Sequence, residues 1–249
     1  MFYLIWQSKI SKFAIIIYYQ HFFFLECFID MDNYNADTYR LITDYFPALP
    51  PEIADAFARL GGLYRSWNER INVVSRADTD NIYCRHVLHS LALAKFFGEL
   101  EDGTTLMDLG TGGGFPGIPM AMLYPRCRFH LIDRIGKKIK VANAIAEEIG
   151  LRNVTFQHGD SGECHERFDY VISRAVMPLD GLVKACSKNI VTVSRHNNRY
   201  APGLACLKGG DLRDEIKAVR RPVVEVPVSD FFSEPFFETK EIVYVPFVK

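Results

Sequence analysis

We predict an α/β fold for this 249-residue chain, with a mainly parallel sheet preceded by a small helical subdomain. Three observations lead to this prediction. From residue 34 to about residue 100, apolar residues recur at three- and four-residue spacing, as in amphipathic helices. After Gly103, short β-rich runs alternate with helical runs, which is typical of strand–helix–strand units. The last two β-rich runs have no clear helix between them, which predicts an antiparallel hairpin at the sheet edge.

The individual elements follow from the same patterns. In the first part, one helical run includes Ile53, Leu60 and Tyr64, and a second includes Ile82 and Phe97. Two consecutive prolines precede the first run, where a helix can begin. The expected strands are 105–109, 128–133, 154–158, 168–173, 204–207, 223–228 and 242–247. The expected helices among them are 117–124, 135–149, 178–188 and 211–219.

The first thirty residues differ from the rest of the chain. Residues 13–29 are strongly apolar, but they fall short of the ~20 residues that a membrane-spanning helix needs. Gln20 and Glu26 interrupt this run, and the lack of a small-residue cleavage site argues against a signal peptide. We therefore expect the natural start at Met31. The expected division is an upstream extension or apolar tail at 1–30, the helical subdomain at 31–101 and a cofactor-binding domain at 102–249.

The overall composition points to no particular macromolecular partner. The formal net charge is −1, so an anionic partner must be met by a local patch. The six cysteines are scattered, with no Cys-x-x-Cys pair and no clustered histidines, so neither a metal site nor a disulfide framework is indicated. Scattered cysteines are typical of small buried residues in a reducing cytosol, which predicts a cytoplasmic protein.

Two stretches nevertheless carry local positive charge. Six Lys/Arg stand against one acid in residues 126–140, and again in residues 184–213. A solvated helix face is an alternative explanation for either stretch. Residues 194–200 combine charge, amides and an aromatic ring, which favours this loop as an RNA contact. Arg85 and His86 are further candidates for the binding crevice, although a lone helical histidine is more often structural.

A glycine-rich loop follows the first expected strand. The loop, residues 110–119, has four glycines in its first five positions, so its backbone can turn tightly and approach a ligand closely. In open α/β sheets, ligands bind at the carboxyl ends of the strands. Gly112, Gly114 and Gly117 also match the dinucleotide-binding fingerprint, and Asp133 follows about 20 residues later, as a ribose ligand should.

Asp108, just ahead of this loop, argues against a dinucleotide. Its carboxylate repels a pyrophosphate, whereas it attracts the ammonium and sulfonium groups of S-adenosylmethionine. Pro116 and Pro119 also remove N–H donors from the helix N-terminus that normally holds the pyrophosphate. The residues therefore favour an S-adenosylmethionine-dependent methyltransferase, with an NAD-dependent oxidoreductase as the alternative.

Three further strand ends supply candidate contacts. Asp133 ends the second strand, where its carboxylate can accept both ribose hydroxyls or serve the next helix N-terminus. Residues 159–162 follow the third strand, where small and polar residues can admit an adenine edge or form a plain turn. Arg174 follows the fourth strand, where its guanidinium can clamp a carboxylate or phosphate, or form a surface ion pair.

Six segments of the sequence occur in the same order in one known family. They are Met107–Pro119 with its glycines and prolines, Trp67-Asn68 with Asn72, Arg85-His86-Val87-Leu88 with Ser90, Leu131-Ile132-Asp133 with Gly136-Lys137-Lys138, Val171-Ile172-Ser173-Arg174-Ala175, and Leu207-Lys208-Gly209-Gly210. Together they resemble the RsmG family, also called glucose-inhibited division protein B, of bacterial small-subunit rRNA guanine-N7 methyltransferases. The glycine loop together with Ser-Arg-Ala is the most specific part of this resemblance.

The resemblance implies a class I S-adenosylmethionine-dependent methyltransferase fold, Rossmann-like, with a small N-terminal helical subdomain. It implies methyl transfer from S-adenosylmethionine to N7 of one guanosine of 16S rRNA, with the rRNA or the 30S particle as partner and no metal. We expect Arg174 to act in catalysis by holding the methionine carboxylate or the RNA backbone. The implied cofactor contacts are Gly110, Phe115, Asp133, Ser161, Gly162 and Arg174.

Two positions depart from the family pattern. His89 stands where the family has an aspartate, so no role of that carboxylate carries over. Ser161 and Gly162 stand where the family commonly has a small residue followed by glutamate, so only backbone contacts carry over there. The alternative is a methyltransferase of the same fold that acts on another base, a protein or a small molecule. Methyltransferases that modify exocyclic amines often carry an Asn/Asp-Pro-Pro motif after the fourth strand, where this chain has Ser-Arg-Ala-Val.

Overall fold

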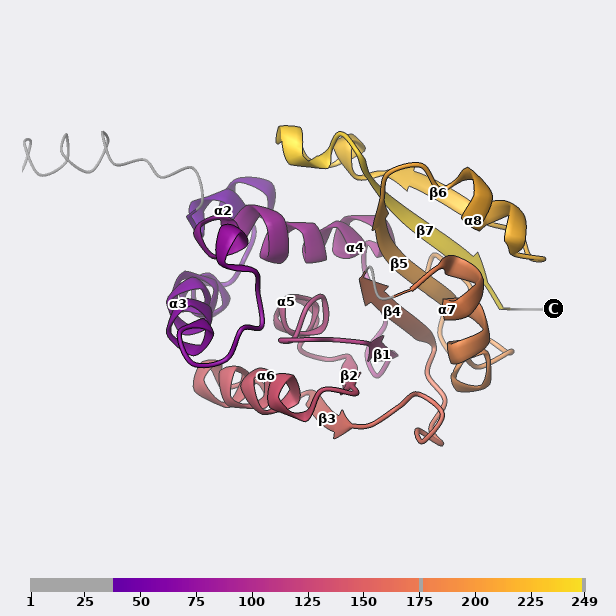
Figure 1. The fold of residues 1–249 in the computed structure, drawn as a ribbon, viewed down its shortest axis with the longest axis horizontal. Coiled ribbons are helices and arrows are strands. Elements are labelled where there is room, and N and C mark those ends of the chain that lie inside the picture. The colour runs from indigo at the N-terminus through magenta and orange to yellow at the C-terminus, as the bar shows by residue number, and fades with distance from the viewer. Residues whose placement is uncertain (1–37, 175–176, 248–249) are drawn as a thin grey trace, which may run out of the picture. The chain divides into compact units, whose positions relative to one another are not determined.

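The computed structural model describes residues 38–174 and 177–247, without the side chains of residues 76 and 77. The upstream extension expected at 1–30, and the expected start at Met31, lie outside the described residues. The described chain forms three layers, a seven-stranded sheet with helices on both faces (Figure 1). In this part of the chain, no helix is both long enough and apolar enough to cross a membrane.

The sheet is mainly parallel. Its strands are β1 Thr105–Leu109, β2 Arg128–Asp133, β3 Val154–His158, β4 Tyr170–Arg174, β5 Gly203–Gly209, β6 Val224–Pro227 and β7 Lys240–Pro246. They lie in the order β3-β2-β1-β4-β5-β7-β6, with β1 to β5 parallel and β7 antiparallel to both of its neighbours. The predicted fold and its hairpin are therefore confirmed, although β7 lies inside the sheet and β6 forms the edge.

The observed bounds of the strands agree best with the predicted ones where they depend only on the neighbouring sequence. β1, β2 and β3 have the bounds that the sequence predicts. β4 begins at Tyr170 instead of residue 168, because Phe168 forms an isolated bridge to Ile190 outside the strand. β5 is longer than predicted because it pairs with β7 along its whole length. A strand end that depends on a distant partner is not visible in the local pattern.

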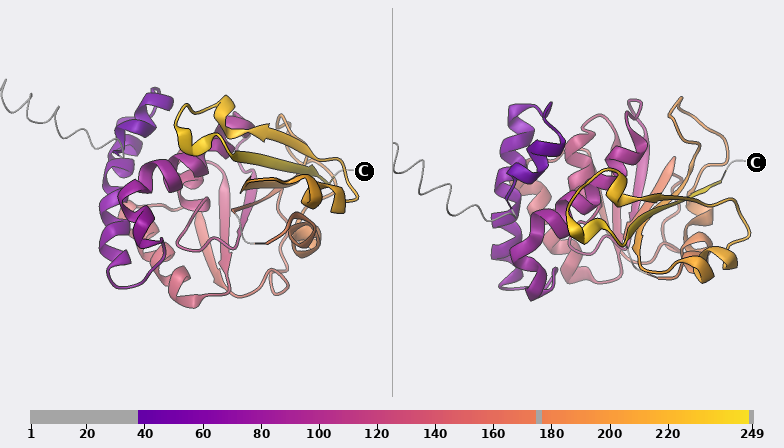
Figure 2. Two further views of the ribbon diagram at one scale, coloured as in Figure 1. Left: turned by 45° about the horizontal axis from the view of Figure 1, so that its top comes forward. Right: turned by 90° about the horizontal axis from the view of Figure 1, so that it is seen from above.

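Helices cover both faces of the sheet (Figures 1 and 2). One face carries α2 Arg40–Tyr45, α3 Pro51–Asn68, α4 His89–Phe97, α5 Gly117–Leu123 and α6 Gly136–Ile149. The other face carries α7 Leu179–Cys186 and α8 Arg213–Ala218. Alternate strand residues serve the two layers, since Leu106 and Ile172 belong to the first core, and Met107 and Val171 to the second. The N-terminal helices thus share one apolar core with the sheet.

The connection between α3 and α4 differs from the regular helix that the sequence predicts. It consists of a 3₁₀ helix, η1 Arg76–Asn81, and a π-helical turn, η2 Tyr83–Leu88. A π-turn accommodates an extra residue in a helix and is frequent at functional sites, but apolar periodicity does not reveal it. Arg85 and His86 both lie in η2, and Ser90 Oγ donates to the His86 carbonyl at 2.6 Å.

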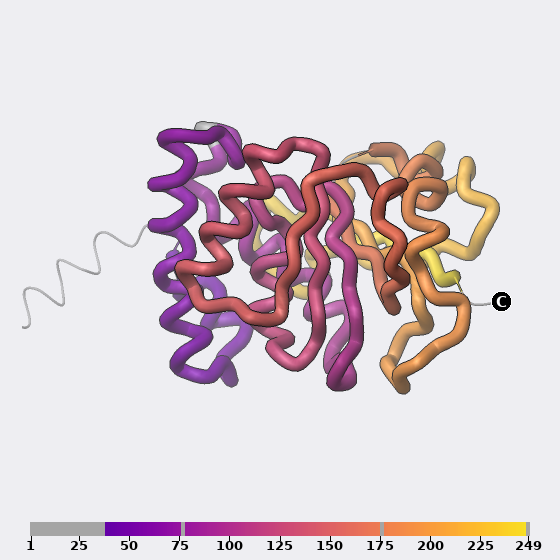
Figure 3. Tube along the Cα trace, turned by 90° about the horizontal axis from the view of Figure 1, so that it is seen from below, coloured from indigo at the N-terminus to yellow at the C-terminus, as the bar shows by residue number. Residues whose placement is uncertain are grey.

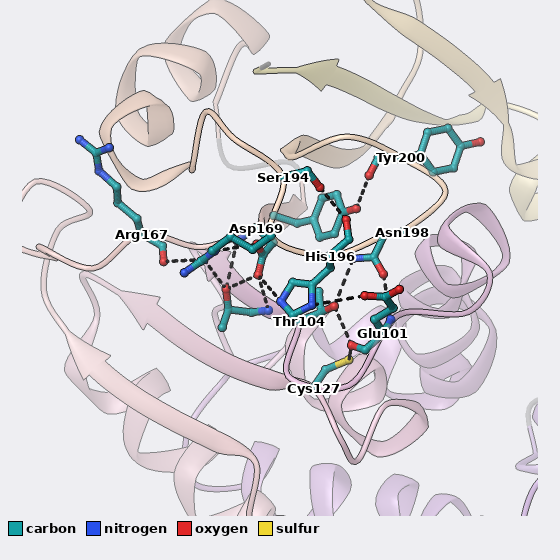
Figure 4. A network of polar contacts seen from close by, with 12 residues as sticks. Glu101, Thr104, Cys127, Arg167, Asp169, Ser194, His196, Asn198 and Tyr200 are labelled. Atoms are coloured by element: carbon teal, nitrogen blue, oxygen red, sulfur yellow. Dashed lines mark hydrogen bonds and ion pairs between the residues drawn. The ribbon is translucent and has the colours of Figure 1, made fainter. Parts of the chain in front are cut away.

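The loop at 194–200 lies at the amino ends of the strands, opposite to the glycine loop (Figures 3 and 4). Asp169, directly before β4, is 2% exposed, and its Oδ1 lies 3.2 Å from Arg195 Nε. The His196 ring lies between two carboxylates, 3.7 Å from Glu101 and 3.6 Å from Asp169. These charged side chains therefore pair with the protein itself.

Asn198 and Tyr200 of this loop also make contacts within the fold. Asn198 accepts a hydrogen bond from the Glu101 amide at 2.8 Å and donates one to Thr104 at 3.1 Å. The Tyr200 ring stacks on Phe96 with ring centroids 4.1 Å apart. The contacts thus give the loop a structural role at the amino edge, and its contact with RNA stays a prediction.

We expect Asp169→Ala to destabilise the protein, because the buried carboxylate accepts from both the amide and the hydroxyl of Thr105, at 2.9 and 2.7 Å. Their loss should lower the free energy of unfolding in urea by about 2–4 kcal/mol. Asp102→Ala is the matched control, since its pair with Arg126 joins side chains that are 63% and 79% exposed. That change should cost no more than about 0.5 kcal/mol. Equal losses in the two variants would contradict the role of Asp169.

Candidate active site

A cavity of about 640 Å³ opens at the carboxyl ends of β1, β2 and β3. Four of the predicted cofactor contacts line it: Gly110, Asp133, Ser161 and Gly162. Residues of α7 line its other side, so the cavity belongs to the α7 face of the sheet. The two remaining predicted contacts, Phe115 and Arg174, are not among the lining residues.

Two apolar residues in the cavity were missed by the sequence reasoning. Ile135 is 42% exposed, which is unusual for a large apolar side chain, and it lines the cavity together with Met177. The buried Lys208 Nζ donates to the Met177 carbonyl at 3.0 Å and lies 2.5 Å from the half-buried Glu215, so an ion pair supports this wall. The sequence signal that could have revealed this wall is the isoleucine two residues after Asp133, because apolar side chains commonly line the binding sites of flat ring systems.

Asp133 joins two loops that border the cavity. Its Oδ2 accepts from the Gly112 amide at 2.8 Å, and its Oδ1 accepts from the Ile135 amide at 2.8 Å. The carboxylate therefore fixes the glycine loop relative to the loop after β2. Each carboxylate oxygen has a second lone pair, so Asp133 can still accept from ribose hydroxyls while it holds both loops.

Asp108 is fully buried at the root of the glycine loop. Its Oδ2 accepts from the Thr111 hydroxyl at 2.6 Å and from the Gly117 amide at 2.7 Å. Its Oδ1 is buried and has no hydrogen-bond partner within the described part of the chain. Burial raises the pKa of Asp108 to about 7, although the two hydrogen bonds lower it. An unsatisfied acidic oxygen of this kind suits a cationic ligand group.

The Gly117 position shows why this loop differs from a dinucleotide site. A Cβ atom there would lie 2.7 Å from both Asp108 and Leu131, so the position needs glycine. Its amide N–H donates to Asp108, whereas a bound pyrophosphate needs free N–H groups at the helix N-terminus. The dinucleotide fingerprint at Gly112, Gly114 and Gly117 is therefore present in the sequence without the corresponding donor in the structure.

The N-terminal helices form the other wall of the glycine loop. Tyr64 of α3 donates its hydroxyl to the Gly113 carbonyl at 2.8 Å. The Val73 side chain fills the space beside Gly113, where a Cβ atom would lie only 2.8 Å from it. Asn68 Oδ1 fixes this segment by accepting from the amides of Val73 and Val74 at 2.8 and 3.0 Å. The helical subdomain thus shapes the loop directly.

Arg174 and Phe115 meet in a second cluster, on the α5 side of the same sheet edge. The Arg174 guanidinium lies 5.1 Å from the centroid of the Phe115 ring, and the His86 ring centroid also lies 5.1 Å from it. Tyr64 stacks on the same ring at 4.5 Å. Arg174 donates to the Arg85 carbonyl at 3.4 Å. The end of β4, the glycine loop and the η2 turn therefore come together here.

Burial sets the charge of this cluster. It lowers the pKa of Arg174 to about 10, against the attraction of Asp108, so the guanidinium remains cationic at neutral pH. Burial, and next the charge of Arg174, lower the pKa of His86 to about 3, so its imidazole is neutral. Among residues 38–174 and 177–247, no group of three or more His, Cys, Asp or Glu side chains is placed to hold a metal ion.

The strand order, the antiparallel β7 and the glycine loop after β1 define a class I methyltransferase fold. A solved structure of a mutant of MtNAS in complex with S-adenosylmethionine shares this fold with a TM-score of 0.50. The similarity covers 74% of this chain and 72% of that chain, at 15% sequence identity.

The sequence places the chain within this class. Residues 55–226 match the family model of rRNA small subunit methyltransferase G, GidB, and the chain belongs to that family. It is 50% identical over 208 residues to the ribosomal RNA small subunit methyltransferase G of Parabacteroides distasonis, covering 84% of this chain and 89% of the relative. It is 51% identical over 205 residues to the protein of the same name from Phocaeicola vulgatus, covering 82% and 97%. The predicted family is therefore confirmed.

The raised pKa of Asp108 predicts a pH-dependent stability of the ligand-free protein. The ordinary carboxyl pKa of 3.8 describes the unfolded chain, and about 7 describes the folded one. The stability contributed by this group is thus complete below about pH 4 and is lost as the pH rises through 7. Asp108→Asn cannot ionise, so between pH 5 and pH 8 it should gain roughly 2–3 kcal/mol relative to the wild type in urea unfolding. A constant difference across this range would contradict the prediction.

Proposed function

We propose that this protein transfers a methyl group from S-adenosylmethionine to N7 of one guanosine in 16S rRNA. The observation that carries the proposal is the match to curated relatives named ribosomal RNA small subunit methyltransferase G over nearly their whole length. The resemblance of the glycine loop and the Ser-Arg-Ala segment supports N7 of guanine as the acceptor. The cavity at the carboxyl edge of the sheet supports a bound small-molecule donor.

The residues at this edge suit the different parts of S-adenosylmethionine. Ile135 and Met177 offer apolar surface for adenine, and Asp133 offers acceptors for the ribose hydroxyls. The unsatisfied Oδ1 of Asp108 suits the ammonium group, and the Arg174 guanidinium suits the carboxylate. Gly110, Ser161 and Gly162 complete the proposed contacts from the loops, and Phe115 would act beside Arg174. When bound, S-adenosylmethionine supplies an electrophilic methyl group on a sulfonium.

The acceptor chemistry makes modest demands on the protein. Guanine N7 carries a lone pair in the neutral base, so methylation at this atom needs no general base. It needs alignment of N7 with the methyl group and exclusion of water. A buried neutral histidine and a buried arginine are consistent with such a site.

Basic side chains near the cavity support rRNA as the substrate. Arg134, Lys184 and Lys188 line it. Arg134 pairs with Asp160 and Lys184 with Asp180, but their side chains remain 75% and 80% exposed. Lys137 lies exposed in the first turn of α6. Such charges bind phosphate groups irrespective of sequence. The substrate would be the rRNA itself or the 30S particle, and the protein would act in the cytoplasm, where that RNA is made and assembled.

Methylation of purified substrates tests the proposal. The protein should bind S-adenosylmethionine and not NAD in equilibrium titrations. With S-adenosylmethionine, it should introduce a single 7-methylguanosine into 16S rRNA or 30S particles, which mapping of the modified RNA would locate. Ribosomal RNA from cells that lack the gene should lack this modification. Methylation at another base, or at no base in either substrate, would refute the proposed function.

Arg174→Ala tests the proposed role of this residue. Removing the guanidinium should lower kcat/KM for rRNA methylation by about 100-fold or more, because a charge-assisted contact to the donor is lost. The circular dichroism spectrum should be unchanged. Arg126→Ala, at the exposed pair on the amino edge, is the control and should retain full activity. Near-normal turnover of the Arg174 variant would remove this residue from the site.

A further inference from the structure

Buried polar atoms without partners gather around Arg174. Six buried side-chain atoms lack a hydrogen-bond partner in the part of the chain that the structure describes, and three of them are the two ring nitrogens of His86 and Nε2 of His89. A fourth is Oδ1 of Asp108. All three residues interact electrostatically with Arg174, whose own hydrogen bond to the Arg85 carbonyl is long, at 3.4 Å.

Such a concentration of unsatisfied groups indicates a ligand. Nearly all buried polar atoms in native proteins are hydrogen-bonded, and each unsatisfied group costs about 1–3 kcal/mol. In the proposed function, the donor accounts for Arg174 and for Oδ1 of Asp108. It leaves the His86 ring without a partner, on the side of Phe115 that faces η2.

The surroundings of His86 suit a flat base. Its ring lies 5.1 Å from Phe115, which itself stacks on Tyr64. The His86 side chain is 13% exposed although both of its ring nitrogens are buried, and the neighbouring Arg85 side chain is 41% exposed, so the cluster lies just beneath the protein surface. Phe236, from the segment between β6 and β7, lies 5.7 Å from the Arg85 guanidinium and extends the aromatic surface.

Asp78 does not form a hydrogen bond with the His86 ring. Its Oδ2 lies 4.0 Å from Nε2, beyond hydrogen-bonding distance, and accepts instead from Ser75 Oγ at 2.6 Å. Its Oδ1 pairs with Arg85 at 2.7 Å. The imidazole therefore keeps an N–H donor for another partner.

We propose that His86 recognises the target guanine by donating one ring N–H to its O6 atom. This inference rests on the proposed function. Guanine presents O6 and N7 side by side as acceptors, and a bidentate arginine usually reads both. An enzyme that methylates N7 must leave this lone pair free, so a single donor directed at O6 is required. A neutral imidazole provides one donor.

The charge of the product also favours a neutral residue here. The N7 lone pair forms the new N–C bond while the C–S bond breaks, sulfur keeps the electron pair and the guanine ring becomes cationic. A protonated histidine would repel this developing charge. The burial that keeps His86 neutral therefore makes it compatible with the reaction.

Two substrates and four proteins test this inference. The substrates are rRNA with guanosine, or with 2-aminopurine, at the target position; 2-aminopurine keeps N7 but lacks O6. The proteins are the wild type, His86→Phe, His86→Asn and the control His130→Phe, whose ring is bonded to Thr155 and Gln157 on β3. Comparison between proteins removes the intrinsic difference in reactivity of the two bases.

The preference is the rate of methylation of the guanosine RNA divided by that of the 2-aminopurine RNA. This ratio should be roughly 10- to 100-fold larger for the wild type than for His86→Phe. His86→Asn, which retains an N–H donor, should recover part of the preference, and His130→Phe should behave as the wild type. The dissociation constant of S-adenosylmethionine should stay within about twofold in all of them. Equal preference in the wild type and both His86 variants would overturn the inference, and so would a parallel loss of donor binding. A wild type that methylates neither RNA would instead refute the proposed function.

Discussion

The carboxyl edge of the sheet depends on one buried carboxylate, that of Asp108. The glycine loop leaves β1 beside this residue and returns to it when the Gly117 amide donates to Oδ2 at 2.7 Å. Thr111, near the start of the loop, donates to the same oxygen. Burying a carboxylate is unfavourable unless it is hydrogen-bonded or paired, so the conformation of the loop and the charge of whatever binds beside it are physically coupled.

The helices ahead of the sheet belong to the same site. Tyr64 holds the Gly113 carbonyl, and Asn68 orders the segment that places Val73 against the loop. This explains one of the shared segments, Trp67-Asn68, by its contacts. The π-turn η2 then brings the His86 ring to 5.1 Å from the Phe115 ring, measured between centroids. The glycine loop thus borders both the cavity on the α7 face and the histidine cluster on the α5 face.

The sequence was most informative where a residue's role follows from its position on a strand. Local patterns locate the first three strands correctly. The glycine loop and the four predicted contacts that line the cavity follow the ends of these strands, so they could be located as well. Ile135 and Met177 were missed because local patterns do not show that two segments distant from each other in sequence, one after β2 and one before α7, line the same cavity. The composition of residues 194–200 also could not show that Arg195 and His196 contact Asp169 and Glu101 within the fold.

The contacts that hold residues 194–200 at the amino edge are separate from the candidate active site. The groups proposed for methyl transfer lie at the other end of the same strands, so a change in this loop should not alter the positions of the reacting groups. A longer or shorter connection from α7 to β5 should therefore leave these groups in place, provided that its contacts with Asp169 remain. Val193, 74% exposed beside the loop, is a position where a label can be attached without displacing a buried side chain.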